Sequence, residues 1–580
     1  MALAFSGRFG TGDMIFGTDL RDLDIAVQDG QAVLYAANGL NGGLSCWQLR
    51  GAGALPQLAS QQLHREAGIR TGDFQLAEVG GGLRLLQGGT GQSALTFYEL
   101  ARDSSLGRQN RDALDGADAG GFGAVAGLEL ADGSAAFYAV GASSGDLQGW
   151  RLDAAGKVQS QVGAAGGSAA YDLDPAALLA TVQTAGGPVV LAADTQGLHS
   201  YRADAATGAL RVSDDLGAAQ GLSVSGVTAL EGFEADGKAW ALLGAAGSSS
   251  LTLLQVGADG GLHVSAQLQD TTVTRFGGVS ALEVVEVEGH VLVLAAGNDG
   301  GLSLFTLTPG GALIHVQSLE HAPGLGLQNV TALEAAAVGG QLQVFVASGG
   351  DDGISQFTLP LASLGERQLA AANATRLDGS VGDDVLEGGR SGANLYGQAG
   401  DDVLVAGADG GWLIGGSGAD TFVINPAAGA VTVRDFTPGE DRLDLSLFEA
   451  LYSAGQLEAQ VRSSGMVMTA GETRIVLLSD AGTSLELADV FGPDLRFSFP
   501  QRQQGGETLP GGGFYGGSGD DRLDGTGGND LLSGAGGNDR LLGRQGNDRL
   551  AAVLRGRVAG PGWGGRGALT ACMGAVTGIG

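Results

Sequence analysis

The sequence predicts an all-β protein, in which a seven-bladed β-propeller is followed by segments of parallel β-roll. Two periodicities carry this prediction: a unit of 51 to 53 residues recurs seven times in the first 365 residues, and a unit of nine residues recurs further along the chain. Glycine supplies 107 of 580 positions, and that density weakens helix interiors and disfavours helix bundles. The glycines follow no Gly-X-Y period, which excludes a collagen helix.

The long repeat is a glycine-marked hairpin such as VLYAANGLNGGLSCWQL. Each copy places one large residue at the equivalent position: Trp47, Tyr98, Trp150, Tyr201, Leu254, Phe305 and Phe357. Turn signals divide each unit into four strands, and in the sixth unit the second strand, His290 to Ala296, is apolar on both faces. A sheet covered on one side would alternate apolar and polar residues, whereas a sheet between two neighbours would not.

Seven even units whose sheets are buried on both sides indicate a β-propeller, and an array of β-sandwiches is the alternative. The unit resembles the blades of seven-bladed lactonase-like and WD-type propellers. The Gly-His and Trp-Asp marks of the WD class are absent, so the resemblance concerns shape alone.

Charge and composition narrow the function. Asp and Glu number 63 against 31 Lys and Arg, a formal charge of −32, which disfavours a nucleic-acid partner. Acidic Gly-Asp segments favour divalent cations, calcium above all. Cys46 and Cys572 lie too far apart in sequence for a disulfide framework. The first residues lack the basic and apolar regions of a secretory signal peptide, and no apolar run is long enough for a transmembrane segment.

The short repeat forms two blocks of tandem nonapeptides. Residues 379–423 hold five copies, such as GSVGDDVLE and GQAGDDVLV, and residues 516–551 hold four, such as GGSGDDRLD and GAGGNDRLL. They match the pattern G-G-x-G-x-D-x-(apolar)-x and resemble the repeats-in-toxin (RTX), or hemolysin-type, calcium-binding family. The resemblance implies a β-roll that binds Ca2+ and a protein secreted by the type I route without an N-terminal signal peptide.

The spacing also has a physical reason. Glycines in a six-residue turn permit positive φ, the sixth-position aspartate supplies an anionic oxygen, and the last three residues form a short strand. Two nonapeptides complete one circuit, so turns on the same side lie two repeats apart, and a calcium ion between them receives carboxylate and carbonyl oxygens. Without the ion, the stacked carboxylates repel one another, and the glycine-rich chain has little core.

The first block predicts a one-sided ladder. Its sixth positions are Asp384, Ala393, Asp402, Gly411 and Asp420, which places aspartates on the odd repeats only. We expect calcium sites between 384 and 402 and between 402 and 420. In the second block all sixth positions are acidic, so both sides should bind: Asp521, Asp530, Asp539 and Asp548. Fourth-position glycines should add carbonyl oxygens: Gly382, Gly400, Gly418, Gly519, Gly528, Gly537 and Gly546.

The segment between the blocks opens with VTVRDFTPGEDRLDLSLF and closely resembles the region after the β-roll in serralysin-type secreted proteases. That resemblance implies strands that cap the roll, a short helix at 447–461, and Asp435 and Asp441 as additional calcium ligands. The two aspartates are equally explained as turn and capping residues.

The chain therefore divides into six expected parts: a propeller (1–365), a first RTX β-roll (366–424), a β-rich cap (425–500), a linker (501–515), a second RTX β-roll (516–551) and an atypical basic, glycine-rich tail (552–580). The tail contains arginines and no acid, which fits a native basic tail or a truncated or frame-shifted end.

Catalytic motifs are missing from the sequence. It has no H-E-x-x-H, so the serralysin resemblance implies no protease activity, and it has neither a clear nucleophile elbow nor a P-loop. Aspartates in the blade loops, such as Asp194 and Asp352, are explained by a ligand-binding rim or by turn chemistry.

Two functions follow. The first is a secreted calcium-binding protein without catalysis, whose propeller presents a surface to an extracellular glycan, a protein or the cell envelope. The second is a secreted hydrolase, lactonase-like or glycosidase-like, with its active site in the propeller channel. A convergence of carboxylates and histidines in that channel would favour the second, and a lining of small residues would count against it.

Overall fold

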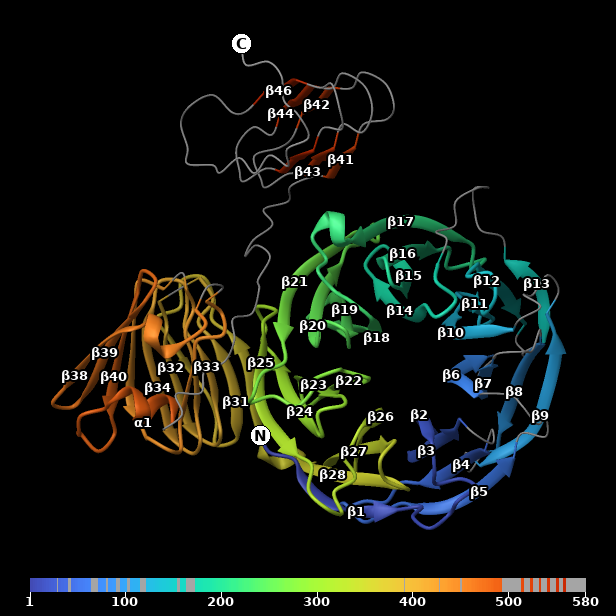
Figure 1. Cartoon of the computed structure of the whole chain (residues 1–580), viewed down its shortest axis with the longest axis horizontal. Helices are drawn as coiled ribbons and strands as arrows, with labels where there is room; N and C mark the ends of the chain where they lie inside the picture. The colour runs from blue at the N-terminus through green and yellow to red at the C-terminus, as the bar shows by residue number, and fades with distance from the viewer. Residues whose placement is uncertain are drawn as a thin grey trace. The chain divides into compact units, whose positions relative to one another are not determined.

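The protein is described here by a computed structural model (Figure 1). It describes residues 1–28, 30–39, 43–63, 71–79, 82–89, 94–101, 105–114, 121–153, 157–162, 173–390, 392–426, 428–448 and 451–492, together with six three-residue strands beyond residue 512. The chain forms two compact units, Met1–Gln503 and Gln504–Gly580.

Seven four-stranded antiparallel sheets form the blades of the propeller in the first unit. Blades 1 to 3 comprise β2 (Leu20–Gln28), β3 (Gln31–Asn38), β4 (Gly43–Gln48), β5 (Gln57–Leu63); β6 (Thr71–Val79), β7 (Gly82–Gly89), β8 (Ala94–Leu100), β9 (Leu106–Ala113); and β10 (Phe122–Glu129), β11 (Ala135–Gly141), β12 (Leu147–Leu152), β13 (Val158–Val162). Blades 4 to 6 comprise β14 (Leu178–Thr184), β15 (Gly187–Ala193), β16 (Gly197–Ala203), β17 (Leu210–Gly217); β18 (Val227–Ala235), β19 (Lys238–Ala245), β20 (Ser250–Val256), β21 (Leu262–Gln269); and β22 (Ala281–Val287), β23 (His290–Ala296), β24 (Gly301–Leu307), β25 (Leu313–Glu320). A 3-10 turn, η1 (Ala218–Gln220), follows β17.

The burial of the second strands confirms the propeller prediction. All seven residues of β23 are buried, as expected for a blade that lies between two others. The seven large residues that mark the repeat are all buried as well, with Trp47 the most exposed at 9%. Six of them lie opposite the fourth residue of the second strand of their blade, as Trp47 does with Leu34 and Phe357 with Val344. Trp150 lies opposite Phe137, the third residue of β11.

The last blade differs from the expected order of four strands in sequence. Blade 7 contains β26 (Val330–Val338), β27 (Gln341–Ser348) and β28 (Ile354–Pro360), and its outer strand is β1 (Ala4–Phe9) from the other end of the chain. β1 runs antiparallel to β28, with Ala4 opposite Thr358 and Phe9 opposite Ile354. Backbone hydrogen bonds therefore join the two ends of the ring, which side-chain contacts alone would otherwise hold together.

A parallel β-solenoid follows the propeller, with one sheet on each side. One sheet contains β29 (Leu364–Leu369), β31 (Asp383–Glu387), β33 (Val403–Val405), β35 (Thr421–Val423) and β37 (Arg442–Asp444). The other begins with β30 (Arg376–Asp378), β32 (Asn394–Ala399), β34 (Gly411–Ser417) and β36 (Ala430–Phe436). Leu386 lies opposite Leu404, and Leu395 opposite Leu413, so one circuit takes two nonapeptides, as predicted. A 3-10 turn, η2 (Leu361–Ser363), connects β28 to the solenoid.

The cap extends the second sheet with β40 (Thr473–Ser479), β39 (Gly465–Ala470) and β38 (Glu458–Arg462). The short helix expected at 447–461 is wrong: the described residues there contain only a 3-10 turn, η3 (Ala454–Gln456), and the start of β38. Pairing with β39 satisfies the backbone of β38, which leaves no reason for a helix. The helix is α1 (Leu487–Phe491), which buries Val490 and Phe491 against the solenoid core.

The solenoid and the propeller share a hydrophobic core. Eighth-position residues such as Leu404 point into the solenoid. Strands β31, β33 and β35 turn their other face to the propeller, where Val385, Val403 and Val423 pack in one cluster with Leu292 and Ile314 of blade 6. The propeller and the first solenoid therefore form one packed body and are not independent domains joined by a linker.

Two arginines of the solenoid complete this interface. Arg442 donates from Nη1 to Nδ1 of His315 at 3.0 Å and from Nη2 to the His315 carbonyl. Burial and this cation lower the pKa of His315 to about 3, so the ring is neutral and its Nδ1 is the acceptor. Arg367 makes a bidentate pair with Asp236 of blade 5, both bonds at 2.7 Å.

The second unit contains two small parallel sheets. Their strands are β41 (Gly513–Tyr515), β43 (Leu531–Ser533) and β45 (Arg549–Ala551) in one, and β42 (Arg522–Asp524), β44 (Arg540–Leu542) and β46 (Arg557–Ala559) in the other. Leu523 pairs with Leu541, and Leu532 with Leu550, which repeats the 18-residue circuit of the first block. β41 and β46 fall in the segments expected as linker and tail.

Candidate calcium ladder and propeller carboxyl ring

The three odd-side aspartates of the first block form a buried column. Asp384, Asp402 and Asp420 are at most 2% exposed. Oδ1 of Asp402 accepts the backbone N–H of Asp384 at 2.8 Å, and Oδ1 of Asp420 accepts that of Asp402 at 3.0 Å. Each carboxylate thus binds the backbone of the preceding circuit and fixes the register of the turns.

The second oxygen of each carboxylate faces a gap that only glycine leaves open. A β-carbon on Gly397 would lie within 3 Å of both Asp402 Oδ2 and the Gly415 carbonyl oxygen. A β-carbon on Gly379 would likewise lie within 3 Å of Asp384 Oδ2 and the Gly397 carbonyl oxygen. Carboxylate and carbonyl oxygens from successive circuits therefore face the same small space, and both are hard ligands of the kind that calcium takes.

Asp402 gives the strongest indication that this position suits a cation. Its Oδ2 is buried and has no hydrogen-bond partner. Burial, with the neighbouring Asp420 and Asp384 carboxylates, raises the pKa of Asp402 to about 8. Burial and nearby carboxylates likewise raise the pKa of Asp420 to about 7. Burying an ionised carboxylate without a partner costs free energy, and a bound cation would offset that cost. These residues therefore fit a cation site.

The fourth-position glycines stack beside this column. Gly400 and Gly418 have φ of 121° and 131°, in the region that favours glycine. A β-carbon on Gly418 would meet the Gly400 carbonyl, and one on Gly400 would meet Gly382. The structure therefore brings together all six predicted residues of the first block.

Asp441 and Asp435 lie at the end of the ladder. Asp441 Oδ1 accepts the N–H of Asp420 at 3.0 Å and continues the column by one more circuit, and burial raises its pKa to about 6. Asp435 accepts the N–H groups of Gly415 and Gly416 at 3.1 and 2.9 Å. Both act as backbone caps, and Asp441 has in addition the position of a ladder residue.

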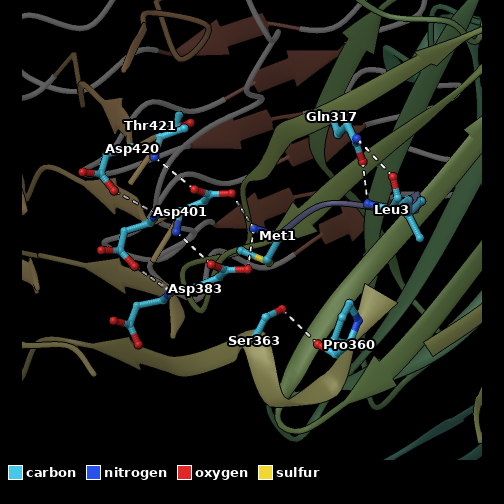
Figure 2. A network of polar contacts seen from close by, with 12 residues as sticks. Met1, Leu3, Gln317, Pro360, Ser363, Asp383, Asp401, Asp420 and Thr421 are labelled. Atoms are coloured by element: carbon cyan, nitrogen blue, oxygen red, sulfur yellow. Dashed lines mark hydrogen bonds and ion pairs between the residues drawn. The ribbon is translucent and has the colours of Figure 1, made fainter. Parts of the chain in front are cut away.

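A second acidic column was not predicted from the sequence. Fifth-position Asp383 and Asp401 stand beside the first column, and Oδ1 of Asp383 accepts the N–H of Asp401 at 2.8 Å. The Met1 ammonium group lies 2.6 Å from Asp383 and 3.5 Å from Asp401, while Leu3 donates its N–H to Gln317 of β25 (Figure 2). The repeated Asp-Asp pair in GDDVLE and GDDVLV was the available signal.

The remaining predicted ligands belong to the second block. Asp521, Asp530, Asp539 and Asp548, with Gly519, Gly528, Gly537 and Gly546, lie outside the described residues. Among the residues that are described, no three His, Cys, Asp or Glu side chains converge on one metal position. The donor set in the first block therefore consists of carboxylates together with backbone carbonyls.

The propeller carries a separate ring of carboxyl groups on its innermost strands. One position recurs on these strands, opposite the fifth residue of the second strand in six blades and opposite the fourth, Tyr138, in blade 3. The seven residues there are Asp24, Gln75, Ala126, Ala180, Glu231, Glu283 and Glu334. They recur every 51 to 54 residues, a signal that sequence inspection missed. We call the four acids among them the carboxyl ring.

Members of this ring position bind the next blade. Asp24 Oδ2 accepts the N–H of Leu76 at 2.9 Å, and Gln75 Oε1 accepts that of Gly127 at 2.5 Å. Glu283 accepts the N–H of Ala335 in the same way. Innermost strands are edge strands with unpaired N–H groups, so these side chains satisfy them and connect successive blades.

Burial raises the pKa values of all four acids, and repulsion from other ring carboxylates adds to this for three of them. Burial, the largest cause, raises the pKa of Asp24 to about 7, and burial with the Asp24 charge raises that of Glu231 to about 7. Burial and the other ring carboxylates raise the pKa values of Glu283 and Glu334 well above the usual range. Each side chain nevertheless remains partly exposed, so solvent reaches the ring.

The aspartates of the blade loops bind backbone N–H groups of the protein itself. Asp194 Oδ1 accepts the N–H groups of Gln196 and Gly197 at 2.7 and 3.1 Å and lies 3.2 Å from Nε2 of His199. Asp352 accepts the N–H of Gly12 at 2.6 Å. The contacts of Asp194 favour the turn interpretation over a ligand-binding rim, whereas Asp352 holds the segment that follows β1.

Comparison with known proteins identifies the short repeat. The model of the RTX calcium-binding nonapeptide repeat matches residues 378–413, 396–423 and 515–550, in four copies. No curated protein matches the chain. No helix in the described residues is both long and apolar enough to cross a membrane.

Similar solved structures include a protein from Lactobacillus plantarum, with 16% identity, a TM-score of 0.40, and coverage of 53% of this chain and 86% of that one. A functionally unknown protein from Desulfotomaculum acetoxidans has 12% identity and a TM-score of 0.36, covering 58% and 98%. Chaetomium thermophilum Polycomb Repressive Complex 2 has 11% identity and a TM-score of 0.43, covering 62% and 98%. Similarity at this level says nothing about what this chain binds or catalyses. The family match and the buried aspartate column instead establish that the chain carries RTX calcium-binding nonapeptide repeats in its C-terminal region, on a parallel β-solenoid that follows a seven-bladed propeller.

Proposed function

We propose that this chain is a secreted calcium-binding protein whose solenoid orders on Ca2+ outside the cell and whose propeller is a rigid binding module. The observation that carries the proposal is the column of Asp384, Asp402 and Asp420, with one buried carboxylate oxygen left without a hydrogen-bond partner. The match to the RTX repeat supports calcium as the cation.

The residues of the ladder explain why the metal and the fold depend on each other. Bound calcium supplies the positive charge that lets stacked carboxylates remain ionised in a buried column. The chain itself supplies the register, because each carboxylate holds the backbone N–H of the preceding circuit. In a cytoplasm poor in calcium the same carboxylates repel one another and the turns stay unformed.

Such a metal-dependent fold suits export as an unfolded chain. RTX repeats favour an extracellular protein, and we propose that it leaves by type I secretion without an N-terminal signal peptide. The propeller then presents its surface to an extracellular glycan, a protein or the cell envelope.

A calcium titration of the full chain tests the proposal. Far-UV circular dichroism in chelator should show the β-signal of the propeller, and added Ca2+ should increase that signal saturably. Mg2+ should not replace it, because magnesium demands a tighter octahedral site. A spectrum that is the same with chelator and with Ca2+ would contradict the proposal.

The carboxyl ring favours one second candidate, a secreted hydrolase. Carboxyl groups with pKa values near 7 are suited to general acid and base chemistry, and lactone or glycoside hydrolysis uses such pairs. No histidine belongs to the ring, and its members already bind the neighbouring blades. An E231Q/E283Q variant decides the question: a hydrolase loses turnover of a lactone or glycoside panel, whereas a structural ring has no turnover to lose.

A further inference from the structure

The two faces of the solenoid differ in character. The sheet of β31, β33 and β35 is covered by the propeller. The sheet that runs from β30 through β32, β34, β36 and β40 to β39 and β38 has its inner residues, such as Leu413 and Val433, in the core. Its alternate residues face outward, and we call them the outer face.

The outer face is aromatic and exposed. Trp412 on β34 is 44% exposed, and Tyr396 on β32 is partly exposed. Asn394, on the rung of Trp412, accepts its backbone N–H at 2.9 Å. These side chains belong to a rigid parallel ladder in which Trp412 lies opposite Thr432, so their spacing is set by the strands.

Arginines stack on both aromatic rings. The guanidinium carbon of Arg434 lies 4.4 Å from the ring centroid of Trp412, and that of Arg376 lies 3.8 Å from the centroid of Tyr396. Each guanidinium is thus held beside a partly exposed ring. Arg376 also donates from Nε and Nη2 to the carboxylate of Asp378 on the same strand. The face thus offers paired aromatic and cationic groups at fixed positions.

The charge of the outer face is opposite to that of the whole chain. Its exposed arginines are Arg376, Arg434, Arg462 and Arg474, against the carboxylates Asp378 and Glu458. The chain as a whole has 31 basic and 63 acidic residues. A locally basic surface on an acidic protein selects a negatively charged partner.

We propose that the outer face binds an anionic polysaccharide, with Trp412 and Tyr396 against sugar rings and Arg434 and Arg474 paired with sugar carboxylates. Arginine forms bidentate pairs with carboxylates, and stacked Arg and aromatic groups are the residues that dominate binding energy at interfaces. A row of strands suits an extended, repeating polymer because it repeats its own binding groups along one direction.

Charge density favours a polysaccharide over a nucleic acid. Nucleic-acid binders neutralise many closely spaced phosphates, and this face has a small basic excess within a chain of charge −32. A uronic-acid polymer presents more widely separated carboxylates and apolar ring faces, which match alternating arginine and aromatic side chains.

Calorimetric titration of the full chain with an oligogalacturonate, at saturating Ca2+, tests the proposal. We expect binding that weakens with added salt, and binding to a neutral glucan oligosaccharide of equal length to be at least about tenfold weaker. An R434Q/R474Q variant should bind about tenfold more weakly or worse, because each lost pair is charge-assisted. R211Q removes one exposed arginine of the propeller and should bind like the wild type.

Further measurements separate loss of binding from loss of fold. The calcium-dependent circular dichroism of R434Q/R474Q should equal that of the wild type, and W412F should retain more affinity than W412A. Equal affinity for the charged and neutral glycans, or an R434Q/R474Q variant that binds normally, overturns the proposal. Tighter binding to single-stranded DNA, lost in the same variant, would assign the face to nucleic acid instead.

Discussion

Asp402 shows how one residue has two separate duties in the solenoid. Oδ1 accepts the backbone N–H of Asp384, which sets the register between circuits, and Oδ2 is buried without a partner. The first duty needs only an oxygen, whereas the second needs a cation. A substitution that keeps the oxygen and removes the charge can therefore separate them.

We expect D402N to lose calcium affinity and to be at least as stable as the wild type in chelator. The amide oxygen of Asn still accepts the Asp384 N–H, and a neutral group costs less to bury than an unpaired carboxylate. In chelator, the free energy of unfolding should equal or exceed that of the wild type, and with saturating Ca2+ it should fall below it by about 1–3 kcal/mol.

Urea unfolding of both proteins with and without Ca2+ measures this difference. D409N changes an exposed aspartate in a turn of the even repeats, and this matched control should leave calcium affinity nearly unchanged. If D402N bound calcium as tightly as the wild type, the ladder would not be the metal site.

Sequence reasoning reached part of the site because of its period. The nine-residue spacing predicts Asp384, Asp402 and Asp420 as neighbours, since strands of one side repeat every 18 residues. It did not predict the role of Asp383 and Asp401, because their partners, Met1 and each other's backbone, come from the packing of the propeller against the roll. The carboxyl ring was not predicted from the sequence. Its period equals that of the blades, and the blade repeat was identified from its large residues alone.

Among the elements, the innermost strands depend on the ring for their contacts. Asp24 and Glu283 satisfy N–H groups of the next blade, so the ring joins neighbouring blades through hydrogen bonds. The same placement crowds carboxyl groups and raises their pKa values. The stability of the propeller should consequently respond to pH in a window set by these groups.

We expect the free energy of unfolding to fall as pH rises from about 4 to about 7. Asp24 and Glu231 have pKa values of about 7 in the folded protein, against roughly 4 when unfolded. The folded state therefore holds more protons in that window, and each group contributes a slope of at most about −1.4 kcal/mol per pH unit.

E231Q, which imitates the protonated acid, should flatten this slope and be more stable than the wild type at pH above 7. E129Q replaces an exposed glutamate of β10 and should leave the profile unchanged. Urea unfolding at constant saturating Ca2+ measures all three proteins, and stability that rose with pH through this window would show that the ring does not control it.

Strand β1 is the second element with a disproportionate role. Phe9 is 7% exposed and packs edge-on against Trp47 at 4.9 Å between centroids, while Phe5 on the same strand is 42% exposed. F9A should lower the free energy of unfolding by about 3–5 kcal/mol, the usual cost of truncating a buried aromatic residue. F5A should cost much less, and denaturant midpoints compare the two; equal losses would mean that β1 does not close blade 7 as described.

The order of strands explains why this closure was not predicted. The 51-residue period shows how many blades there are, but a circular repeat looks the same wherever the chain enters it. The segment AFSGRF has three apolar residues, one glycine and no turn signal of its own, so nothing local marks it as the outer strand of blade 7. The helix expected at 447–461 failed similarly, because the pairing of β38 with β39 decides the backbone there.

At the scale of the whole molecule, the first unit is one packed body. Val385, Val403 and Val423 of the solenoid share a cluster with blade 6, and Arg442 and Arg367 bind blades 6 and 5. The apolar β33 sequence VLV, buried on both faces, was a sequence signal for this contact, by the same reasoning that identified His290 to Ala296. Calcium at the ladder should therefore stabilise more than the solenoid.

Hydrogen exchange of the full chain tests this coupling. Chelation should reduce protection in β23, β24 and β25 of blade 6, because their solenoid partner loosens. Blade 4, whose clusters contain no solenoid residue, should keep its protection in β15 and β16. Equal protection of blade 6 with and without Ca2+ would show that the shared core does not transmit the effect.

The pairing of Ala4 with Thr358 has a consequence for the order in which the protein folds. Pairing two segments so far apart in sequence has a large loop-closure entropy cost and is slow. We therefore expect β1 to pair with β28 late in folding and to separate from it early in unfolding. A chain exported through a membrane in the unfolded state would emerge with an open propeller. The ring could close only after both segments had reached the same side. The pairing of β1 with β28 would thus be the step that completes folding of the propeller.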